Sequence, residues 1–543
     1  PKDDRHVIQP ERLRGGGVAH SGCIGSDTGG DYTFVCALPP AGPEGPAYAL
    51  SAALPPSIIG IPRKHPMGQL PEGLIAVVKR DCPTCNLVVP VLRQLAIHKQ
   101  ALTVYSQDDP NFPDDGVVDD TALVHSYRLG IQIVPTLIRV ADGVETQRTI
   151  GWDRVEWEKV SGLTDLGPGL PSSRPGCGSK TEEPGTSEQL AVRFGKVSFR
   201  SRRVEISRSS DPIEACYERG WTDGLPVVPP TPERVLAMLK GTTRRPQEIV
   251  GRIPPDYVEC SVEKVAINAV LAGCKPEYLS VVLTAVEASL VPEFGLHGVL
   301  ATTNFIGPVV MVNGPIARAI GMNARGNALG QGNRANGTIG RALQLVVRNV
   351  GGGRPGEIDR ATLGNPGKYT FCFAEDEEGS LWESYAVERG FAKDASTVTV
   401  FVGDGAAPIV DEISRTPESL ARSFAACLRA AHHPKKVIDV AAFLVVTPEH
   451  ARVFHDAGWS KLRLKRELET LLQIPVAELL RGVNGIEAGI LPSEAPDPQG
   501  TLPKFRTGSL NIVRAGGSAG KFSAYISGLG SITINPVTKE ITP

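Results

Sequence analysis

The sequence from Leu74 to His98, LIAVVKRDCPTCNLVVPVLRQLAIH, decides the fold of the N-terminal part of the chain. Its first residues, 74–80, form a short run rich in β-branched side chains, which predicts a strand. Residues 86–98 carry apolar side chains at helical spacing. Cys82 and Cys85 lie between the two elements. We therefore expect Cys82 at a helix N-terminus, where free N–H groups and the helix dipole stabilise a thiolate.

The residues that follow continue the alternation of strands and helices. The pattern predicts a strand at 101–107, a helix at 122–130, two strands at 136–143 and 145–152 that an Asp-Gly turn joins, and a final helix at 152–162. Alternation at this pitch is typical of a compact α/β domain, here over residues 70–165.

A C-x-x-C pair alone fits either a redox dithiol or half of a zinc site. A structural zinc site needs four Cys or His ligands, usually from a second pair at similar spacing. The chain has no second C-x-x-C and no H-x(3–5)-H near Cys82 and Cys85. The spacing therefore favours a redox pair.

Two segments resemble thioredoxins. DCPTCNLVVPVLRQLA (81–96) resembles the active-site helix of that family, with Pro90 where the family kinks the helix, and GIQIVPTLIRVADG (130–143) resembles its cis-proline segment. The resemblance implies a thioredoxin-like fold, a cis bond before Pro135 and a substrate groove lined by Val134.

The same resemblance implies that Cys82 is the exposed attacking thiolate and that Cys85 resolves the mixed disulfide. The chain departs from the family at two places. Asp81 replaces the usual aromatic residue and opposes thiolate formation, which Lys79 and Arg80 offset. Ala76 stands where the family buries an acidic residue. These departures favour a dedicated electron carrier or a binding remnant over a general disulfide reductase.

The 543 residues are enough for about three or four domains. Residues 1–69 are rich in Pro, Gly and Ala and predict an extended arm or a small irregular domain. Residues 166–210 are rich in Pro, Gly, Ser and charge and predict a linker. Residues 211–543 predict a larger α/β domain of one or two lobes. The fold class is thus α/β, a thioredoxin-like domain followed by a larger domain.

Composition limits the classes of binding partner and the cellular location that we expect. The net charge of −2 gives no reason to expect nucleic acid or an anionic membrane. No apolar run approaches the roughly 18 residues of a membrane span, and the N-terminal residues lack a signal-peptide core. Ten scattered cysteines suit a reducing compartment, so we expect a cytoplasmic protein. A homo-oligomer is the base-rate expectation for such an enzyme.

The segment 311–353, MVNGPIARAIGMNARGNALGQGNRANGTIGRALQLVVRNVGGG, is crowded with Gly, Asn and Arg and leads into a helix expected near Thr338. Glycines let backbone approach a ligand, and arginines pair with carboxylate or phosphate. We predict a site for a small anionic substrate here; the alternative is that Gly and Asn only supply left-handed turns. The candidate binding residues are Asn313, Arg325, Asn333, Arg334, Asn336, Thr338 and Arg341.

Two other segments could complete this cleft. Residues 217–235, YERGWTDGLPVVPPTPERV, suggest a rigid pocket wall with Trp221 and Asp223. The glycine-rich segment 513–530 could close the cleft with Lys521.

An acidic run and a histidine support a different reading. Glu375 and Glu378 belong to a run of four acidic residues after a strand-like segment, and His297 lies between glycine-flanked apolar pieces. Together they could hold a divalent metal. The alternatives are a solvated turn for the acidic run and an ordinary core position for the histidine.

Cys177, in RPGCGSK, is predicted on a flexible, electropositive loop as a partner of the Cys82 dithiol. Residues 211–530 also resemble a group of bacterial proteins of unsettled function associated with a UGSC motif, in GWTDGLPVVPPTPERV, NRANGTIGRALQLVVRNVGG and AGGSAGKFSA. Here Cys177, Gly178 and Ser179 match that motif, and Lys180 replaces its last cysteine.

The sequence thus predicts a thiol-dependent oxidoreductase. Its dithiol relays electrons to a fused α/β domain that reduces a small anionic substrate or cleaves its carbon–heteroatom bond, and a thiol reductant or a thioredoxin-reductase-like protein supplies the electrons. The sequence identifies no cofactor with certainty; a divalent metal belongs to the first alternative, a metal-dependent lyase or hydrolase with a structural thioredoxin domain. The second alternative is a redox-controlled scaffold or assembly subunit.

Overall fold

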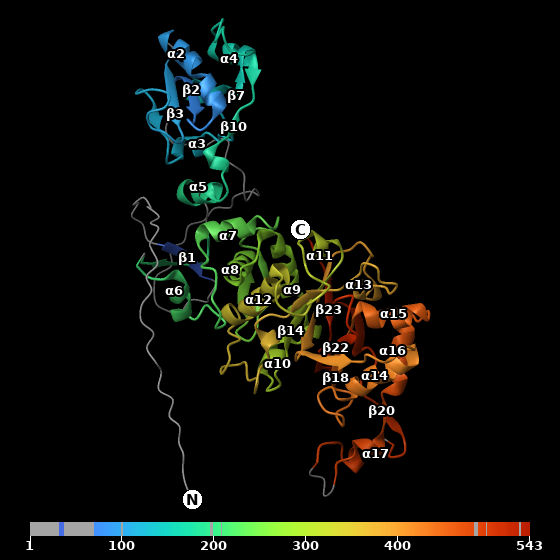
Figure 1. Cartoon of the computed structure of the whole chain (residues 1–543). Helices are drawn as coiled ribbons and strands as arrows, with labels where there is room; N and C mark the ends of the chain where they lie inside the picture. The colour runs from blue at the N-terminus through green and yellow to red at the C-terminus, as the bar shows by residue number, and fades with distance from the viewer. Residues whose placement is uncertain are drawn as a thin grey trace, which may run out of the picture.

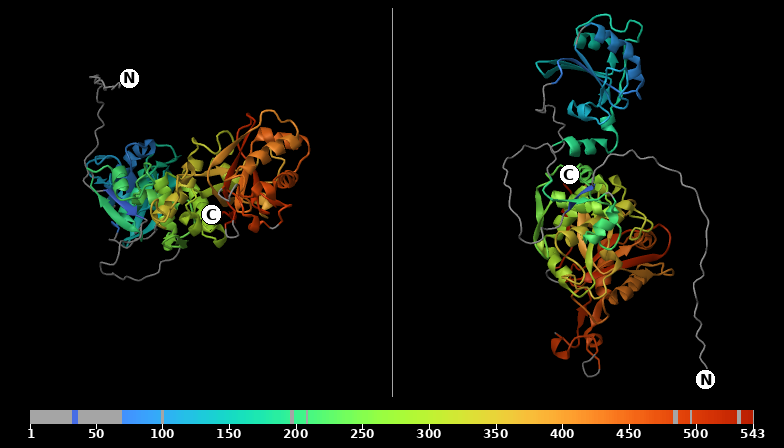
Figure 2. Two further views of the ribbon diagram at one scale, coloured as in Figure 1. Left: turned by 90° about the horizontal axis from the view of Figure 1, so that it is seen from below. Right: turned by 90° about the vertical axis from the view of Figure 1, so that its left-hand side faces the viewer.

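The computed structural model describes residues 32–36, 70–98, 101–195, 199–207, 209–482, 487–495, 497–530 and 534–542. They form a mixed α/β protein with several mixed sheets, the class that the sequence predicts. Two bodies are visible in Figures 1 and 2, an N-terminal unit (residues 70–195) and a large unit (residues 209–542). They meet where helix α5 packs against helix α7 and Glu188 pairs with Lys240.

The N-terminal unit is built on a five-stranded sheet of order β4–β3–β2–β6–β7. Strand β2 is parallel to β3, which is parallel to β4, whereas β6 is antiparallel to β2 and β7. All five side chains from Leu74 to Val78 in β2 are fully buried, so both faces of this central strand are covered. The elements are β2 (Gly73–Val78), α1 (Pro83–Leu87), α2 (Val89–Ile97), β3 (Leu102–Ser106), β4 (Val118–Asp119), α3 (Val124–Arg128), β6 (Thr136–Ala141), β7 (Val144–Ile150) and α4 (Arg154–Ser161).

The local signals in this unit agree with the sequence. Asp142 and Gly143 both have positive φ, as a two-residue hairpin turn between β6 and β7 requires. Asp153 caps α4 by accepting a hydrogen bond from Glu156 N–H. The helix after the cysteines is interrupted at Val88, just before Pro90, which has no N–H to donate.

Residues 166–210, for which the sequence predicts a linker, carry ordered structure. Few of their side chains are apolar, and they are held instead by short strand pairings and side-chain hydrogen bonds, so no hydrophobic period signals them. The elements and their partners are β9 (Ser173–Arg174) on β8 (Trp152–Asp153), β10 (Cys177–Gly178) on β5 (Ile133–Val134), η1 (Lys180–Glu182), α5 (Thr186–Phe194) and β11 (Arg202–Ile206).

The predicted arm or small domain at residues 1–69 lies outside the described residues, except for strand β1 (Tyr32–Cys36). This strand falls in one of the apolar pieces of the arm and pairs antiparallel with β11.

Two four-stranded sheets form the centre of the large unit, in the orders β15–β14–β16–β23 and β17–β22–β18–β21. The strands of the first are β14 (Gly307–Asn313), β15 (Cys372–Ala374), β16 (Thr397–Gly403) and β23 (Val537–Glu540). Those of the second are β17 (Ala406–Val410), β18 (Val440–Val446), β21 (Leu510–Arg514) and β22 (Phe522–Leu529).

The period-two alternation of apolar side chains explains how these sheets are layered. Val309 and Met311 of β14 share a core cluster with Phe443 of β18, so one face of each sheet packs against the other. Val310 and Val312 point the opposite way, into the cluster that contains helices α8, α9 and α12. The second sheet buries its outer face under α14, α15 and α16. The result is four layers, helix–sheet–sheet–helix (Figure 1). Because the sheets share a core, the large unit is one body and not two lobes.

The helices and minor strands of the large unit complete these layers. Before the acidic run they are α6 (Pro212–Glu218), α7 (Pro232–Leu239), β12 (Ile249–Ile253), β13 (Val258–Ser261), α8 (Val262–Ala272), η2 (Pro276–Tyr278), α9 (Leu279–Ser289), η3 (Pro292–Phe294), α10 (Leu296–Ala301), α11 (Pro315–Ala319), α12 (Arg334–Asn349) and η4 (Pro366–Lys368). After it they are α13 (Tyr385–Glu388), α14 (Pro417–Arg429), α15 (Pro448–Asp456), α16 (Lys461–Leu471), β19 (Gln473–Pro475), α17 (Val476–Leu479), η6 (Pro492–Glu494) and β20 (Thr501–Pro503).

In the part of the chain that the structure describes, no single helix has the length and apolarity needed to cross a bilayer. Pro276–Ser289 and Pro292–Ala301, bent by 73°, pass that test only when taken together, and only by length and composition.

Candidate functional site

The cysteine pair lies where the central strand β2 of the N-terminal unit leads into helix α1. Cys82 is the N-cap of α1, in extended backbone conformation, and Pro83 opens the helix. The Cys82 sulfur accepts a hydrogen bond from the backbone N–H of Cys85 at 3.3 Å. The carboxylate of Asp108 accepts hydrogen bonds from the backbone N–H groups of Arg80 and Asp81, which fixes the turn before the helix.

The two thiols have opposite electrostatic environments. The pKa of Cys82 is lowered to about 5, first by a hydrogen bond from the Cys85 thiol, and also by the Cys177 thiol and the N–H groups of Cys85 and Thr84, against the effect of burial. Burial and the hydrogen bond with Cys82 raise the pKa of Cys85 far above its ordinary value. Cys82 is therefore a thiolate at neutral pH, whereas Cys85 is a protonated thiol.

A third cysteine completes the site. Cys177 lies in β10, directly opposite Val134 in the β5–β10 pairing, and its thiol interacts with that of Cys82. The Cys82 sulfur also lies 3.6 Å from the carbonyl oxygen of Val134, and the Val134–Pro135 peptide bond is cis. The sequence thus identifies Cys177 as a neighbour of the dithiol, although it predicts a flexible loop where the structure has a strand.

Residues 175–181, here called the covering segment, are fixed over the pair. Thr84 donates a hydrogen bond from its hydroxyl to Pro175 O at 2.7 Å. Ser179 N–H donates to Gln132 O at 2.8 Å, and the Gln107 amide donates to the Ser179 hydroxyl at 2.7 Å. Sequence reasoning missed Thr84 and Gln107, because a single polar residue in a buried element carries no periodic signal.

No protein-family model matches the chain, and a search of curated proteins also finds no match. The site is therefore interpreted from its own geometry.

The large unit has a pocket of about 300 Å³ at the end of strands β14 and β15. It joins two segments that the sequence marks separately, the Gly/Asn/Arg-rich segment and the acidic run. Charged and polar side chains in its wall are Arg318, Asn323, Arg325, Glu375, Asp376 and Glu377. Glu378, the last residue of the acidic run, also lines it and pairs with Arg325 at 2.6 Å.

Buried polar contacts hold the pocket wall in place. Asn313, predicted for this cleft, donates hydrogen bonds to Glu375 at 2.6 Å and to Glu377 at 3.1 Å. Burial raises the pKa of Glu375 despite buried Lys461, whose ammonium lies 3.8 Å from its carboxylate. Nothing in the sequence marks Lys461, because a lysine in an amphipathic helix is normally exposed.

The glycine-rich C-terminal segment reaches the same place, as the sequence predicts. Gly516 N–H donates a hydrogen bond to Ala324 O at 2.9 Å, and Arg514 pairs with Asp376 at 3.2 Å. Burial raises the pKa of Asp376, and Arg514 opposes that shift. Lys521 lies beyond this contact, with its ammonium 3.4 Å from Glu412 O, and is not part of the pocket wall.

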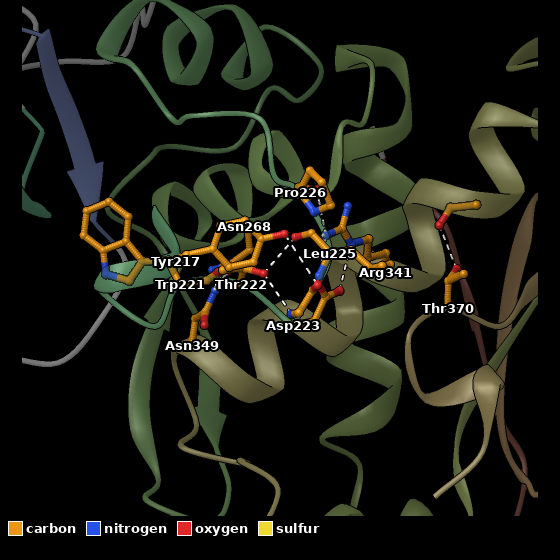
Figure 3. A network of polar contacts seen from close by, with 12 residues as sticks. Tyr217, Trp221, Thr222, Asp223, Leu225, Pro226, Asn268, Arg341, Asn349 and Thr370 are labelled. Atoms are coloured by element: carbon orange, nitrogen blue, oxygen red, sulfur yellow. Dashed lines mark hydrogen bonds and ion pairs between the residues drawn. The ribbon is translucent and has the colours of Figure 1, made fainter. Parts of the chain in front are cut away.

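Arg341 and Asp223, two predicted substrate contacts, bind each other instead. Arg341 donates two hydrogen bonds to the Asp223 carboxylate, at 2.7 and 2.8 Å, and further ones to Leu225 O and Pro226 O (Figure 3). Trp221 is 2 % exposed and belongs to the core. The segment after α6 is thus fastened to α12, and neither Arg341 nor Asp223 lines the pocket.

The first turn of α12 also serves the fold. The helix begins at Arg334, four residues before the predicted start, because the Asn333 side chain caps it by accepting from Asn336 N–H at 3.0 Å. Arg334 donates to Gly273 O, and the Thr338 hydroxyl donates to Arg334 O. Asn336 is buried and accepts from Asn323 N–H, so it positions a pocket residue from behind.

The predicted metal ligands do not assemble. His297 is exposed on α10, where its Nδ1 lies 2.9 Å from the Tyr257 hydroxyl. Among the described residues, no three His, Cys, Asp or Glu side chains are grouped so that they could hold a metal ion. In the described residues His297 is thus not grouped with Glu375 and Glu378, whose carboxylates pair with Lys461 and Arg325.

Proposed function

We propose that the N-terminal unit is thioredoxin-like and that the chain is a thiol-dependent oxidoreductase with Cys82 and Cys85 as its dithiol. The observation that carries the proposal is the geometry of the pair: Cys82 is the N-cap of α1, and its sulfur accepts a hydrogen bond from Cys85 N–H at 3.3 Å and lies 3.6 Å from Val134 O. The contrast between the lowered pKa of Cys82 and the raised pKa of Cys85 supports it. The sheet order and the position of the pair at the N-terminus of α1 support the fold assignment.

The exchange follows from this contrast. The Cys82 thiolate attacks one sulfur of a disulfide acceptor, forms a mixed disulfide and expels the other sulfur as a thiolate. Cys85 then loses its proton and attacks the Cys82 sulfur, which releases the second thiolate. The protein is left with a Cys82–Cys85 disulfide, and two electrons have moved to the acceptor.

The direction of transfer is set by the same groups. A stabilised Cys82 thiolate favours the reduced form of the pair, so a thiol donor reduces the Cys82–Cys85 disulfide readily, and the reduced pair gives electrons only to an acceptor that is more oxidising than itself. Reduction of a chromogenic small disulfide by the full chain, compared with its Cys82→Ser variant, tests the proposal.

We further propose that the pocket of the large unit binds a small anionic substrate and that the dithiol supplies it with electrons. The volume of about 300 Å³ suits a small metabolite. Four carboxylates also line the wall, but Glu378 is paired with Arg325, Asp376 with Arg514 and Glu375 with Lys461, which leaves Arg318 as the cation for an anionic group. The covalent link between the units and the packing of α5 on α7 support a shared function.

The Arg318→Gln variant tests the pocket. In a thermal-shift screen of small carboxylates and phosphates, we expect at least one to stabilise the wild-type chain, by about 2.7 kcal/mol at one hundred times its Kd. Arg318→Gln should lose that stabilisation, because an anion would lose its cationic partner. The matched control, exposed Arg360→Gln, should keep it. A ligand that stabilises both variants equally would contradict the assignment.

A further inference from the structure

The three clustered cysteines differ in their exposure to solvent. The expectation that Cys82 is exposed is wrong, because Cys82 is 1 % exposed and lies beneath residues 175–181. Cys85 is fully buried, whereas Cys177 is partly exposed. Of the three cysteines, Cys177 is thus the residue most accessible to a molecule that arrives from solvent.

The cover over the pair is part of the fold. The hydrogen bond from Thr84 to Pro175 O fastens the covering segment to the active-site helix itself. A Cβ at Gly176 would lie 2.4 Å from the Ile133 side chain and 2.6 Å from Val134 O, so only glycine lets the segment lie this close to β5. Cys177 is thus held against Cys82 by contacts on both sides of it.

The β5–β10 pairing favours a small molecule over a protein as the electron donor. The backbone edge of β5 at Val134 is already occupied by Cys177, so a protein substrate cannot add a strand there. A small thiol needs only to reach one sulfur. Burial and the neighbouring Cys82 raise the pKa of Cys177, and the positive charge of Lys79 partly opposes that shift.

We propose that electrons enter the dithiol through Cys177, which exchanges with a low-molecular-weight thiol from solvent. This inference rests on the proposed function of Cys82 and Cys85 and adds the point of entry and the class of donor.

The steps balance as three exchanges. The Cys177 thiol loses its proton as its sulfur attacks the Cys82 sulfur of the oxidised pair; a Cys82–Cys177 disulfide forms, the Cys82–Cys85 bond breaks, and the released Cys85 thiolate takes up a proton. The thiolate of the small donor attacks the Cys177 sulfur and expels the Cys82 thiolate. A second donor thiolate attacks the donor sulfur of that mixed disulfide and frees Cys177. Two donor thiols become one disulfide, and the pair is reduced by two electrons.

The test uses the oxidised full chain with reduced glutathione as the probe, an acid quench and peptide mass spectrometry without reductant. We expect glutathione on Cys177 and none on Cys82, and a Cys82–Cys177 disulfide in the oxidised Cys85→Ser variant. Cys177→Ser should slow reduction of the pair by glutathione at least roughly tenfold, because access limits the exchange. The partly exposed Cys427→Ser is the matched control and should react at the wild-type rate.

A second variant distinguishes the loss of the Cys177 thiol from the effect of the covering segment on access to Cys82. Adding Thr84→Val to Cys177→Ser frees the covering segment and should restore part of the lost rate by exposing Cys82. Glutathione found on Cys82 of the wild type, with an unchanged rate in Cys177→Ser, would overturn the entry route and leave the dithiol intact. If Cys82 and Cys85 never form a disulfide in the wild type, the proposed function itself fails.

Discussion

The Cys82→Ser variant should show no catalysed reduction of a chromogenic small disulfide, at any concentration at which the wild-type chain is active. Serine keeps the size of the side chain and the N-cap acceptor, so α1 should still form. What it removes is the sulfur that forms the mixed disulfide and then the Cys82–Cys85 bond. Without that atom Cys85, a buried thiol with a raised pKa, cannot form the Cys82–Cys85 disulfide that completes the cycle.

The measurement is the release of the coloured thiol per mole of protein, followed over many turnovers. Cys427→Ser, a substitution of the same kind at a partly exposed thiol of the large unit, should leave the rate unchanged. Turnover by Cys82→Ser at the wild-type rate would show that another group performs the reduction.

The Lys461→Met variant should lose about 3–5 kcal/mol of unfolding free energy at neutral pH, because it leaves a buried carboxylate without its cation. Lys461 is 7 % exposed and lies between the carboxylates of Glu375, at 3.8 Å, and Glu388, at 3.1 Å. Glu375 is itself buried in the wall of the pocket. Chemical denaturation monitored by tryptophan fluorescence measures the loss.

The pH dependence of this loss identifies its cause. The pKa of Glu375 is raised in the folded protein. Such a carboxyl group stabilises the folded state at pH values below its ordinary pKa of about 4.5, and this stabilisation is lost as the pH rises. The penalty in Lys461→Met should therefore be larger at pH 8 than at pH 5. The double variant with Glu375→Gln should recover most of it. Lys465→Met, the same change at a partly exposed position of α16, is the control. An equal loss at both pH values would show that lost packing, and not charge, is responsible.

The sequence predicts the N-terminal unit well because its signals are local. Residues 74–80 form a short run rich in β-branched side chains, residues 136–152 read as two strands, and the Asp142-Gly143 turn between them supplies the two positive φ angles that the hairpin needs. Residues 166–210, predicted as a linker, contain ordered elements instead. The sequence does not indicate them because strands as short as β10 have no detectable period. Their place is set by partners distant in the sequence, such as Thr84 for Pro175.

The pocket could be predicted only in part for a related reason. The sequence predicts Asn313 and Arg325 for a ligand cleft because glycine-rich turns and charges favour a ligand site, but it marks the acidic run separately, and only the fold brings that run to the same pocket. Arg341 shows the limit, because a binding arginine and a structural one look alike until the partner, Asp223, is brought next to it by the fold.

The most direct test of the account is the titration of Cys82 in the reduced chain, followed by the ultraviolet absorbance of the thiolate and taken as the difference between the wild type and Cys82→Ser. The account predicts a midpoint near pH 5, with the thiolate fully formed at neutral pH. A midpoint near 9, the ordinary value of a cysteine thiol, would contradict it, because Cys82 would then be a buried, unactivated residue.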